Sequence, residues 1–296
     1  MKPADLLLAL LVVVVWGVNF VVIKAGVTEV PPLLLGALRF AAAAFPATLL
    51  FRRPALPLRL YLAYGMTISV GQFAFLFTAI HVGMPSGLAS LVLQSQAFFT
   101  MIFAALWLKE TWRPSQLFGL VLAGGGLALI GSAHGLTMPL AGFLLTLAGA
   151  SLWAAGNIVT REVSRHGPVD MQAFVVWASL VPPIPFLLLS WLIEGPQAIV
   201  AAMAGFSWRS AGAVLYLAWI ATLLGYGLWS RLLSRYPANQ VAPFALLVPL
   251  VGLTSGWLVY GERLQAVHFA GGALLMAGLA VNLFGSRLMA RLRGAT

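Results

Sequence analysis

The sequence is poor in charge and contains no cysteine. Only 8% of its 296 residues are charged, whereas an ordinary soluble domain has about 25%. So few charges cannot cover the surface of a soluble fold of this size. A soluble enzyme, a disordered chain and a nucleic-acid binder are therefore excluded, and the lack of cysteine excludes a disulfide or a thiolate metal site. The hydrophobic share of 61% indicates an integral membrane protein instead.

Ten apolar runs are long enough to cross a bilayer, which takes roughly 20 residues in a helix. A transmembrane barrel would need short segments that alternate apolar and polar residues. Continuous apolar stretches such as 12–15 and 33–35 favour helices. The sequence therefore predicts an all-α integral membrane protein with ten transmembrane helices, over residues 5–23, 31–51, 58–80, 86–108, 115–133, 138–160, 170–192, 209–232, 238–260 and 265–286.

The positive charges are distributed unevenly between the two sides of the predicted bundle. Of the 17 Lys and Arg residues, 13 fall on the side of the N terminus and three on the other side, and Arg39 lies within a span. Because basic loops stay in the cytoplasm, both termini are predicted to be cytoplasmic. Short basic loops facing an anionic leaflet also account for the net charge of +10 without nucleic acid.

The chain shows signs of an internal repeat. Trp16 is followed by Lys24 at the same spacing as Trp153 is by Arg161. A second offset pairs Pro85 with Pro237, Glu110 with Glu262, and Gly119 with Gly271. The sequence thus predicts two five-helix repeats, 1–134 and 135–296, with chance similarity of composition as the alternative. Because five is odd, the second repeat is inverted, as in many alternating-access transporters.

Several short stretches, spread over almost the whole chain, carry a family resemblance. They are residues 10–24 (LLVVVVWGVNFVVIK), 38–40 (LRF), 83–99 (GMPSGLASLVLQSQAFF), 153 with 156–157 (W, GN), 225–227 (GYG), 241–243 (VAP), 247–249 (LVP) and 262–264 (ERL). The chain resembles the EamA-type branch of the drug/metabolite transporter superfamily, and is most similar to the O-acetylserine/cysteine exporter group. The resemblance implies a ten-helix inner-membrane carrier that exports amino acids or related metabolites. Relatives with this fold also export threonine, methionine and aromatic amino acids.

Arg39 is a basic residue inside a predicted span. Ionisable groups within a membrane need a partner, and the fork of N–H groups on arginine suits a substrate carboxylate. Arg39 is therefore a candidate substrate-binding residue. The alternative is a structural role, in which it bonds to backbone carbonyls or holds helices together at the interface.

Two asparagines follow tryptophans in the first and sixth spans: Asn19 after Trp16, and Asn157 after Trp153. An amide can accept a hydrogen bond from an ammonium group and donate one to a carboxylate. An indole offers an apolar wall or a cation–π surface. All four residues are predicted to bind substrate, with interhelical bonding and packing as the alternatives.

Glutamines form the densest polar group within the predicted spans. Gln72 lies in the third span, and Gln94 and Gln96 lie in the fourth. Positions two apart are about 200° apart on an ideal helix. We therefore expect only one of Gln94 and Gln96 to line the transport path. Gln72 and Gln94 are taken as candidate substrate-binding residues.

The eighth span has four aromatic residues, Tyr216, Trp219, Tyr226 and Trp229. On an ideal helix they share one broad face. This face is predicted to form a wall of the pathway, with Tyr226 in contact with substrate. Packing against neighbouring helices is the alternative.

Two prolines and two glutamates are candidates for hinges or gates. Pro243 and Pro249 interrupt the backbone hydrogen bonds of the ninth span and are predicted to form a hinge. Glu110 and Glu262 lie at opposite membrane boundaries, where they can cap adjacent helix starts, pair with Arg113 and Arg263, or act as gates.

The fifth and tenth spans are rich in glycine and alanine, which allow close approach of helices. They are predicted to form scaffold and a homodimer contact. A nucleotide-binding interpretation of these glycines fails, because no strand precedes them and no P-loop lysine follows.

All seven acidic residues fall at predicted span ends. An ion-coupled carrier usually keeps a carboxylate within the membrane. The sequence therefore favours uniport of an amino-acid substrate by alternating access. Proton-coupled antiport of drugs or of other small metabolites such as nucleotide sugars is the alternative. Because the spans contain no HExxH, GxSxG or Ser/His/Asp grouping, no enzyme activity, catalytic residue, cofactor or metal site is predicted.

Overall fold

All the regular secondary structure of the described residues is helical, without a strand. The computed structural model describes residues 1–135 and 137–293, and their side chains except at 238, 239 and 286–293. Within these residues, ten helical spans are long and apolar enough to cross a membrane. The predicted all-α fold with ten transmembrane helices is confirmed. Three of the 13 basic residues counted above, Arg287, Arg291 and Arg293, have side chains outside the described set.

The first five spans are built from eight helical segments of α type and two of other types. They are α1 (Pro3–Glu29); α2 (Pro32–Ala44) with α3 (Ala47–Leu50); α4 (Leu58–Tyr64), η1 (Gly65–Gly71) and α5 (Gln72–His81); α6 (Ser86–Val92), η2 (Leu93–Ser95) and α7 (Gln96–Leu108); and α8 (Pro114–Ser132).

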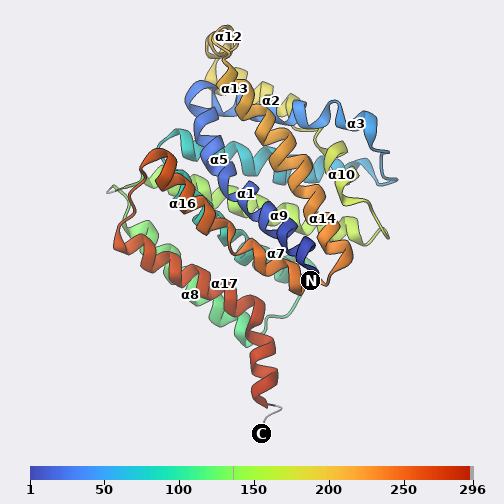
Figure 1. Ribbon diagram of the computed structural model, residues 1–296, viewed down its shortest axis with the longest axis vertical. Helices are drawn as coiled ribbons and strands as arrows, with labels where there is room; N and C mark the ends of the chain where they lie inside the picture. Colours follow the sequence, from blue (N-terminus) through green and yellow to red (C-terminus); the bar gives the residue numbers. More distant parts are fainter. Residues whose placement is uncertain (136, 294–296) are drawn as a thin grey trace.

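The second five spans follow the same order. They are α9 (Leu140–Ser164); α10 (Met171–Ala178), α11 (Pro183–Leu189) and η3 (Ser190–Glu194); α13 (Trp208–Leu215), η4 (Tyr216–Leu224) and α14 (Gly225–Arg235); α15 (Ala238–Ala245) with α16 (Val248–Tyr260); and α17 (Ala266–Arg293). A short helix outside the spans, α12 (Pro196–Ala204), stands apart at one end of the molecule (Figure 1).

Consecutive spans reverse direction, so their ends gather on two sides of the bundle. On the side of residue 1, called here the N-terminal side, Asp5 Oδ1 lies 3.1 Å from Arg235 Nη1 and so joins α1 to α14. On the opposite side, Glu194 Oε1 accepts a hydrogen bond of 2.7 Å from Leu33 N and so joins η3 to α2. The N terminus lies beside α14 in Figure 1.

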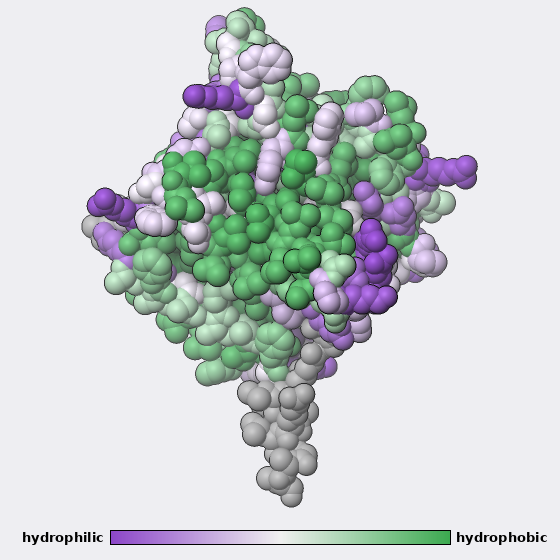
Figure 2. All heavy atoms as spheres, viewed as in Figure 1, coloured by the Kyte–Doolittle hydropathy of each residue, from purple (hydrophilic) through white to green (hydrophobic). Residues whose placement is uncertain are grey.

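An apolar surface covers the middle of the molecule, and hydrophilic residues gather at its edges (Figure 2). Large apolar side chains such as Leu50, Val121 and Ile193 are more than 70% exposed. Lipid tails are the environment that makes such exposure favourable. The surface therefore agrees with ten helices that cross a bilayer.

The helix bounds of the fourth and ninth spans repeat at the offset of 152 found in the sequence. Segments α6 and α7 begin at Ser86 and Gln96, and α15 and α16 begin at Ala238 and Val248. The break at η2 corresponds to the break between α15 and α16. Each span also ends in a left-handed residue, Lys109 with φ 56° and Gly261 with φ 63°. The repeat is therefore visible in the backbone as well as in the residue types. The exact boundary between 1–134 and 135–296 stays a prediction.

Helices α8 and α17 lie side by side along one edge of the bundle (Figure 1). A Cβ atom at Gly126 would lie 2.5 Å from the carbonyl oxygen of Gly271, and one at Gly119 would lie 2.7 Å from that of Gly278. Glycine is needed at these positions because the two backbones touch. The predicted close approach of these spans thus occurs within one chain, and the homodimer stays a prediction.

π-helical turns widen three of the spans. They are η1 in the third span, η3 in the seventh and η4 in the eighth. π-type turns occur frequently at functional sites, because they rotate the following side chains away from the α-helical pattern. Two of the three, η1 and η4, border the central cavity.

Candidate substrate site

A cavity of about 390 Å³ lies between the spans, in the middle of the bundle. It is lined by residues of α1, α2, the third and fourth spans, α9, α10, the eighth span, α15 and α16. All eight residues predicted to bind substrate line it: Trp16, Asn19, Arg39, Gln72, Gln94, Trp153, Asn157 and Tyr226. The structure therefore brings together residues from six different spans. Their role in binding stays a prediction.

The cavity does not reach equally far towards the two sides of the bundle. Towards the N-terminal side, its lining reaches Thr160, Met171 and Leu233, which lie near the ends of α9, α10 and α14. Towards the opposite side, it stops at the fully buried Ser90 in α6. The cavity thus extends further towards the N-terminal side.

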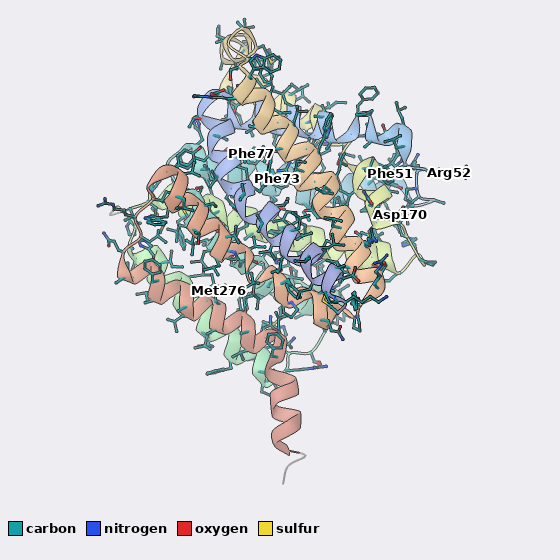
Figure 3. All side chains as sticks on the ribbon, in the orientation of Figure 1. Phe51, Arg52, Phe73, Phe77, Asp170 and Met276 are labelled. Carbon is teal, nitrogen blue, oxygen red and sulfur yellow. The ribbon has the colours of Figure 1, made fainter. Side chains whose placement is uncertain are left out.

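Arg39 lies in the cavity wall and is only 2% exposed. Its Nη2 donates a hydrogen bond of 3.1 Å to Thr222 Oγ1, and its Nε and Nη1 have no partner among the described atoms. The guanidinium also lies over the ring of Phe73, 3.8 Å from its centroid. Phe73 is inside the bundle beside Phe77 (Figure 3).

The π-helical turn η4 holds the partner of Arg39 in place. Thr222 Oγ1 donates a hydrogen bond of 2.8 Å to the carbonyl of Leu217, five residues earlier. The hydroxyl proton of Thr222 is therefore used in this bond, and the hydroxyl oxygen is free to accept a hydrogen bond from Arg39. One neutral hydroxyl and aromatic faces only partly offset the cost of burying a positive charge. Arg39 therefore remains able to bind an anionic group.

Two amide oxygens in the cavity wall also lack partners. Asn19 Oδ1 and Gln72 Oε1 are buried and accept no hydrogen bond from any described atom. A buried polar atom without a partner costs about 1–3 kcal/mol. These oxygens can accept from an ammonium group. The cavity thus combines free donors on Arg39 with free acceptors on Asn19 and Gln72.

Asn157 is partnered differently from Asn19. Its Nδ2 donates to Gln96 Oε1 at 2.8 Å and to Thr100 Oγ1 at 3.0 Å, so it joins α9 to α7. This is the interhelical bonding that the sequence left open as an alternative. The side chain still lines the cavity.

The expectation that only one of Gln94 and Gln96 faces the path is wrong, because both line the cavity. It assumed an ideal α-helix, whereas Leu93–Ser95 forms a 3-10 turn. Such a turn advances about 120° per residue, so that positions two apart are about 120° apart by the shorter way round, compared with about 160° in an α-helix.

Aromatic rings form one wall of the cavity. Trp16 packs against Tyr226 and Trp229, with centroid distances of 5.5 and 5.2 Å, and all three line the cavity. Trp16 Nε1 also donates to the carbonyl of Ala221 at 3.0 Å.

The shared aromatic face predicted for the eighth span is only partly correct. Trp219 is 44% exposed and donates to the carbonyl of Ala42, and Tyr216 donates to the carbonyl of Val15. The prediction assumed α-helical geometry, but η4 covers both residues. The wider π turns change the direction of the side chains relative to Tyr226 and Trp229.

Several lining residues of the third span were not among those predicted from the sequence. Tyr64, Ile68 and Leu76 line the cavity together with Gln72. All four are spaced four residues apart, a spacing that predicts one shared face on an ideal α-helix. This spacing was the signal that could have identified them once Gln72 was chosen.

The four predicted hinge and gate residues lie outside the described lining of this cavity. Pro243 is inside α15, and Pro249 is in the first turn of α16, on either side of the break in the ninth span. Glu110 pairs with Arg161, with 2.8 Å between Oε1 and Nη1. Glu262 pairs with Lys24 rather than with Arg263, with 2.7 Å between Oε1 and Nζ. Hinge and gate roles stay predictions.

Glu262 is held in its charged form. Burial raises the pKa of its carboxyl, but hydrogen bonds from Lys24, Gly87 and Ser86 outweigh burial and hold the pKa below the ordinary glutamate value. Ser86 N and Oγ donate to Oε1 at 2.8 and 2.9 Å, and Gly87 N donates to Oε2 at 2.9 Å. The carboxylate therefore caps the first turn of α6 from the other repeat.

A second cavity, of about 560 Å³, lies in the loops of the N-terminal side. Its lining includes Phe51, Arg52 and Asp170, which lie close together at the edge of the bundle (Figure 3). Its charged lining residues are exposed, and none of the predicted site residues lies there. Nowhere in residues 1–135 and 137–293 do three or more His, Asp or Glu side chains form a group that could hold a metal ion.

A family model described as "EamA-like transporter family" matches residues 4–132 and 140–284. The chain belongs to the EamA-like transporter family. This confirms the resemblance inferred from the sequence and identifies a transporter rather than an enzyme.

Relatives of this EamA transporter match along nearly its full length. A "Probable amino-acid metabolite efflux pump" of Salmonella typhimurium is 50% identical over 291 residues, with 97% of each chain covered. A protein of the same description from Escherichia coli strain K12 is 47% identical over 290 residues, again with 97% of each chain covered. An "Uncharacterized inner membrane transporter YedA" of the same strain is 26% identical over 278 residues, 91% of this chain and 88% of its own. The EamA transporter is thus a multi-pass inner-membrane protein.

A solved structure described as "Crystal structure of protein" superposes on the EamA transporter with a TM-score of 0.60. It covers 95% of this chain and 96% of its own, at 19% sequence identity. This likeness shows the fold alone.

Proposed function

We propose that this EamA transporter exports amino acids and related metabolites, and that Arg39 binds the carboxylate of the substrate. The observation that carries the proposal is the buried guanidinium of Arg39, whose Nε and Nη1 have no partner among the described atoms. A substrate carboxylate would supply both the missing acceptors and the missing counter-charge.

The remaining polar groups of the cavity suit the other end of an amino acid. Asn19 Oδ1 and Gln72 Oε1 are free to accept from an α-ammonium group. Trp16 and Trp153 add aromatic faces, which attract a cation. A zwitterion therefore matches free donors and free acceptors at the same time.

The names of the relatives favour the same substrate class, because two proteins close to 50% identical are described as probable amino-acid metabolite efflux pumps. Within this class we propose cysteine or O-acetylserine, followed by threonine, methionine and aromatic amino acids. The aromatic wall of Trp16, Tyr226 and Trp229 suits an apolar or aromatic side chain.

Transport proceeds in this proposal by alternating access between two repeats, with both termini in the cytoplasm as the positive-inside rule predicts. The cavity then faces the cytoplasm in the present state. Export follows the gradient of the substrate itself, as a uniport. The described lining residues support this, because they include no acidic residue or histidine that could carry a proton.

Proton-coupled antiport of drugs or nucleotide sugars is the second candidate. A nucleotide sugar has a diphosphate, and Arg39 is the only basic residue among the described lining residues. A single guanidinium matches one carboxylate better than it matches a diphosphate.

The proposal predicts saturable efflux of labelled amino acids from proteoliposomes without an ion gradient. The panel is cysteine, O-acetylserine, threonine, methionine and phenylalanine, each measured with and without an imposed pH gradient. Efflux that is equal in both conditions supports uniport. Accumulation against a substrate gradient, driven by pH, would instead establish proton coupling, and no flux of any panel member would overturn the amino-acid proposal.

A further inference from the structure

Two ion pairs are related to one another by the internal repeat. Lys24 and Arg161 are counterparts at the end of the first span of each repeat, and Glu262 and Glu110 are counterparts after the fourth. Lys24 pairs with Glu262 and Arg161 pairs with Glu110. Each pair therefore joins the first span of one repeat to the fourth span of the other. One pair lies on the opposite side of the bundle and one on the N-terminal side.

The two pairs differ sharply in exposure. The side chains of Glu262 and Lys24 are 8% and 27% exposed. Those of Glu110 and Arg161 are 54% and 46% exposed. A surface ion pair contributes little because solvent screens it, whereas a pair withdrawn from solvent is costly to break, since removing one partner leaves the other charge without compensation. Of the two pairs, that of Lys24 and Glu262 is therefore the stronger link between helices in this state.

The partly buried pair of Lys24 and Glu262 lies on the opposite side of the bundle, where the cavity ends. Glu262 accepts from the backbone of Ser86 and Gly87 at the start of α6. At the same place α6 packs closely on α16. A Cβ atom at Gly87 would lie 2.9 Å from Leu253 Cα. The cavity ends here, at Ser90. On the N-terminal side, where the exposed pair lies, the cavity lining reaches Thr160, which precedes Arg161.

We propose that the two pairs are alternate locks of the transport cycle. The lock of Lys24 and Glu262 is closed in the present state and keeps the opposite side shut. In the other state this pair becomes exposed and releases the start of α6, and the pair of Arg161 and Glu110 becomes buried and shuts the N-terminal side. Glu110 then caps the start of α15 as Glu262 caps α6 here. The four residues are positioning residues, because they act on the helices and touch no substrate.

This inference rests on the alternating access of the proposed function, and not on the identity of the substrate. A carrier with inverted repeats reaches its second state when the two repeats exchange their conformations. The exchange maps the buried pair onto the exposed one. Weakening a lock in one state shifts the population towards the other state.

The absence of cysteine allows the locks to be tested by site-directed labelling without background. Ser90→Cys reports opening on the opposite side, and Thr160→Cys reports opening on the N-terminal side. Each is labelled in right-side-out and in inverted membrane vesicles with a membrane-impermeant maleimide. The lock variants are Glu262→Gln and Glu110→Gln, each combined with either reporter.

Glu262→Gln is expected to raise the labelling rate of Ser90→Cys from the opposite side about tenfold, as a shift of ~1.4 kcal/mol produces. It lowers labelling of Thr160→Cys from the N-terminal side. Glu110→Gln is expected to leave the labelling rate of Ser90→Cys from the opposite side unchanged, or to lower it. Lys24→Gln repeats the Glu262→Gln result and keeps the test valid if that variant does not fold. Glu162→Gln is the matched control, because Glu162 and its partner Arg165 are both exposed at the same end of α9. We expect it to leave the labelling of both reporters unchanged.

Unchanged labelling in Glu262→Gln and Lys24→Gln, or a rise of Ser90→Cys labelling in Glu110→Gln, would overturn the locks. The readout needs no substrate. Shifted labelling without amino-acid flux would therefore refute the proposed substrate and keep the locks, and flux with unshifted labelling would do the reverse.

Discussion

Replacing Arg39 with glutamine is expected to lower the efflux of amino acids about 100-fold at subsaturating substrate, which corresponds to ~2.7 kcal/mol. The variant removes the positive charge of the cavity but keeps an amide of similar reach. A charge-assisted, forked pair with the carboxylate is lost, and such bonds are among the strongest in proteins. The measurement is the initial efflux rate from proteoliposomes, normalised to the amount of reconstituted protein.

Two further variants show whether the charge or its geometry matters. Arg39→Lys keeps the positive charge but lacks the forked N–H groups of arginine. We therefore expect its efflux rate to lie between that of Arg39→Gln and that of the native protein. Arg53→Gln is the matched control, because Arg53 is exposed at the N-terminal side, lies over the ring of Tyr61 and does not line the central cavity. Efflux by Arg39→Gln at the level of Arg53→Gln would contradict the assigned role of Arg39.

Replacing Gly126 with alanine is expected to destabilise the protein by about 1–3 kcal/mol, as overpacking of a close contact does. The added Cβ would lie 2.5 Å from the carbonyl oxygen of Gly271 and 2.7 Å from the backbone N of Leu275. Both are backbone atoms of α17, so they cannot move aside without separating the helices. The expected result is a fall in the unfolding temperature of the purified protein in detergent.

The neighbouring Gly125 provides the control for this prediction. Nothing lies within 4 Å of the position that its Cβ would occupy. Because alanine has a higher helix propensity than glycine, Gly125→Ala is expected to leave the unfolding temperature unchanged or to raise it slightly. Equal unfolding temperatures for the two variants would show that α8 and α17 do not pack through Gly126.

The architecture could be predicted because the features that determine it can be read directly along the sequence. Each span is a run of apolar residues long enough for a bilayer, and the repeat appears as fixed offsets between residue types. Residues that are polar yet lie in the middle of a span, such as Arg39 and Gln72, must face the interior, because lipid offers no partner. This is why all the residues chosen for their polarity line the cavity.

The details that failed depend on backbone geometry that residue types do not reveal. Trp219 faces away from the cavity because η4 is π-helical, and Gln94 and Gln96 share the cavity because η2 is a 3-10 turn. Both errors come from applying 100° per residue to a helix that departs from it. The partner of Glu262 was missed for another reason. Lys24 is 238 positions away, and the nearer Arg263 was the obvious choice from the sequence.

The most direct test of the central claim compares an amino acid with its own carboxamide in the native protein. Methionine and methionine amide share a side chain and an α-amino group, and differ in the carboxylate that Arg39 is proposed to bind. The account predicts saturable efflux of methionine from proteoliposomes, with little efflux of the amide and little competition by it. Equal transport of the two compounds would contradict recognition of the carboxylate by Arg39.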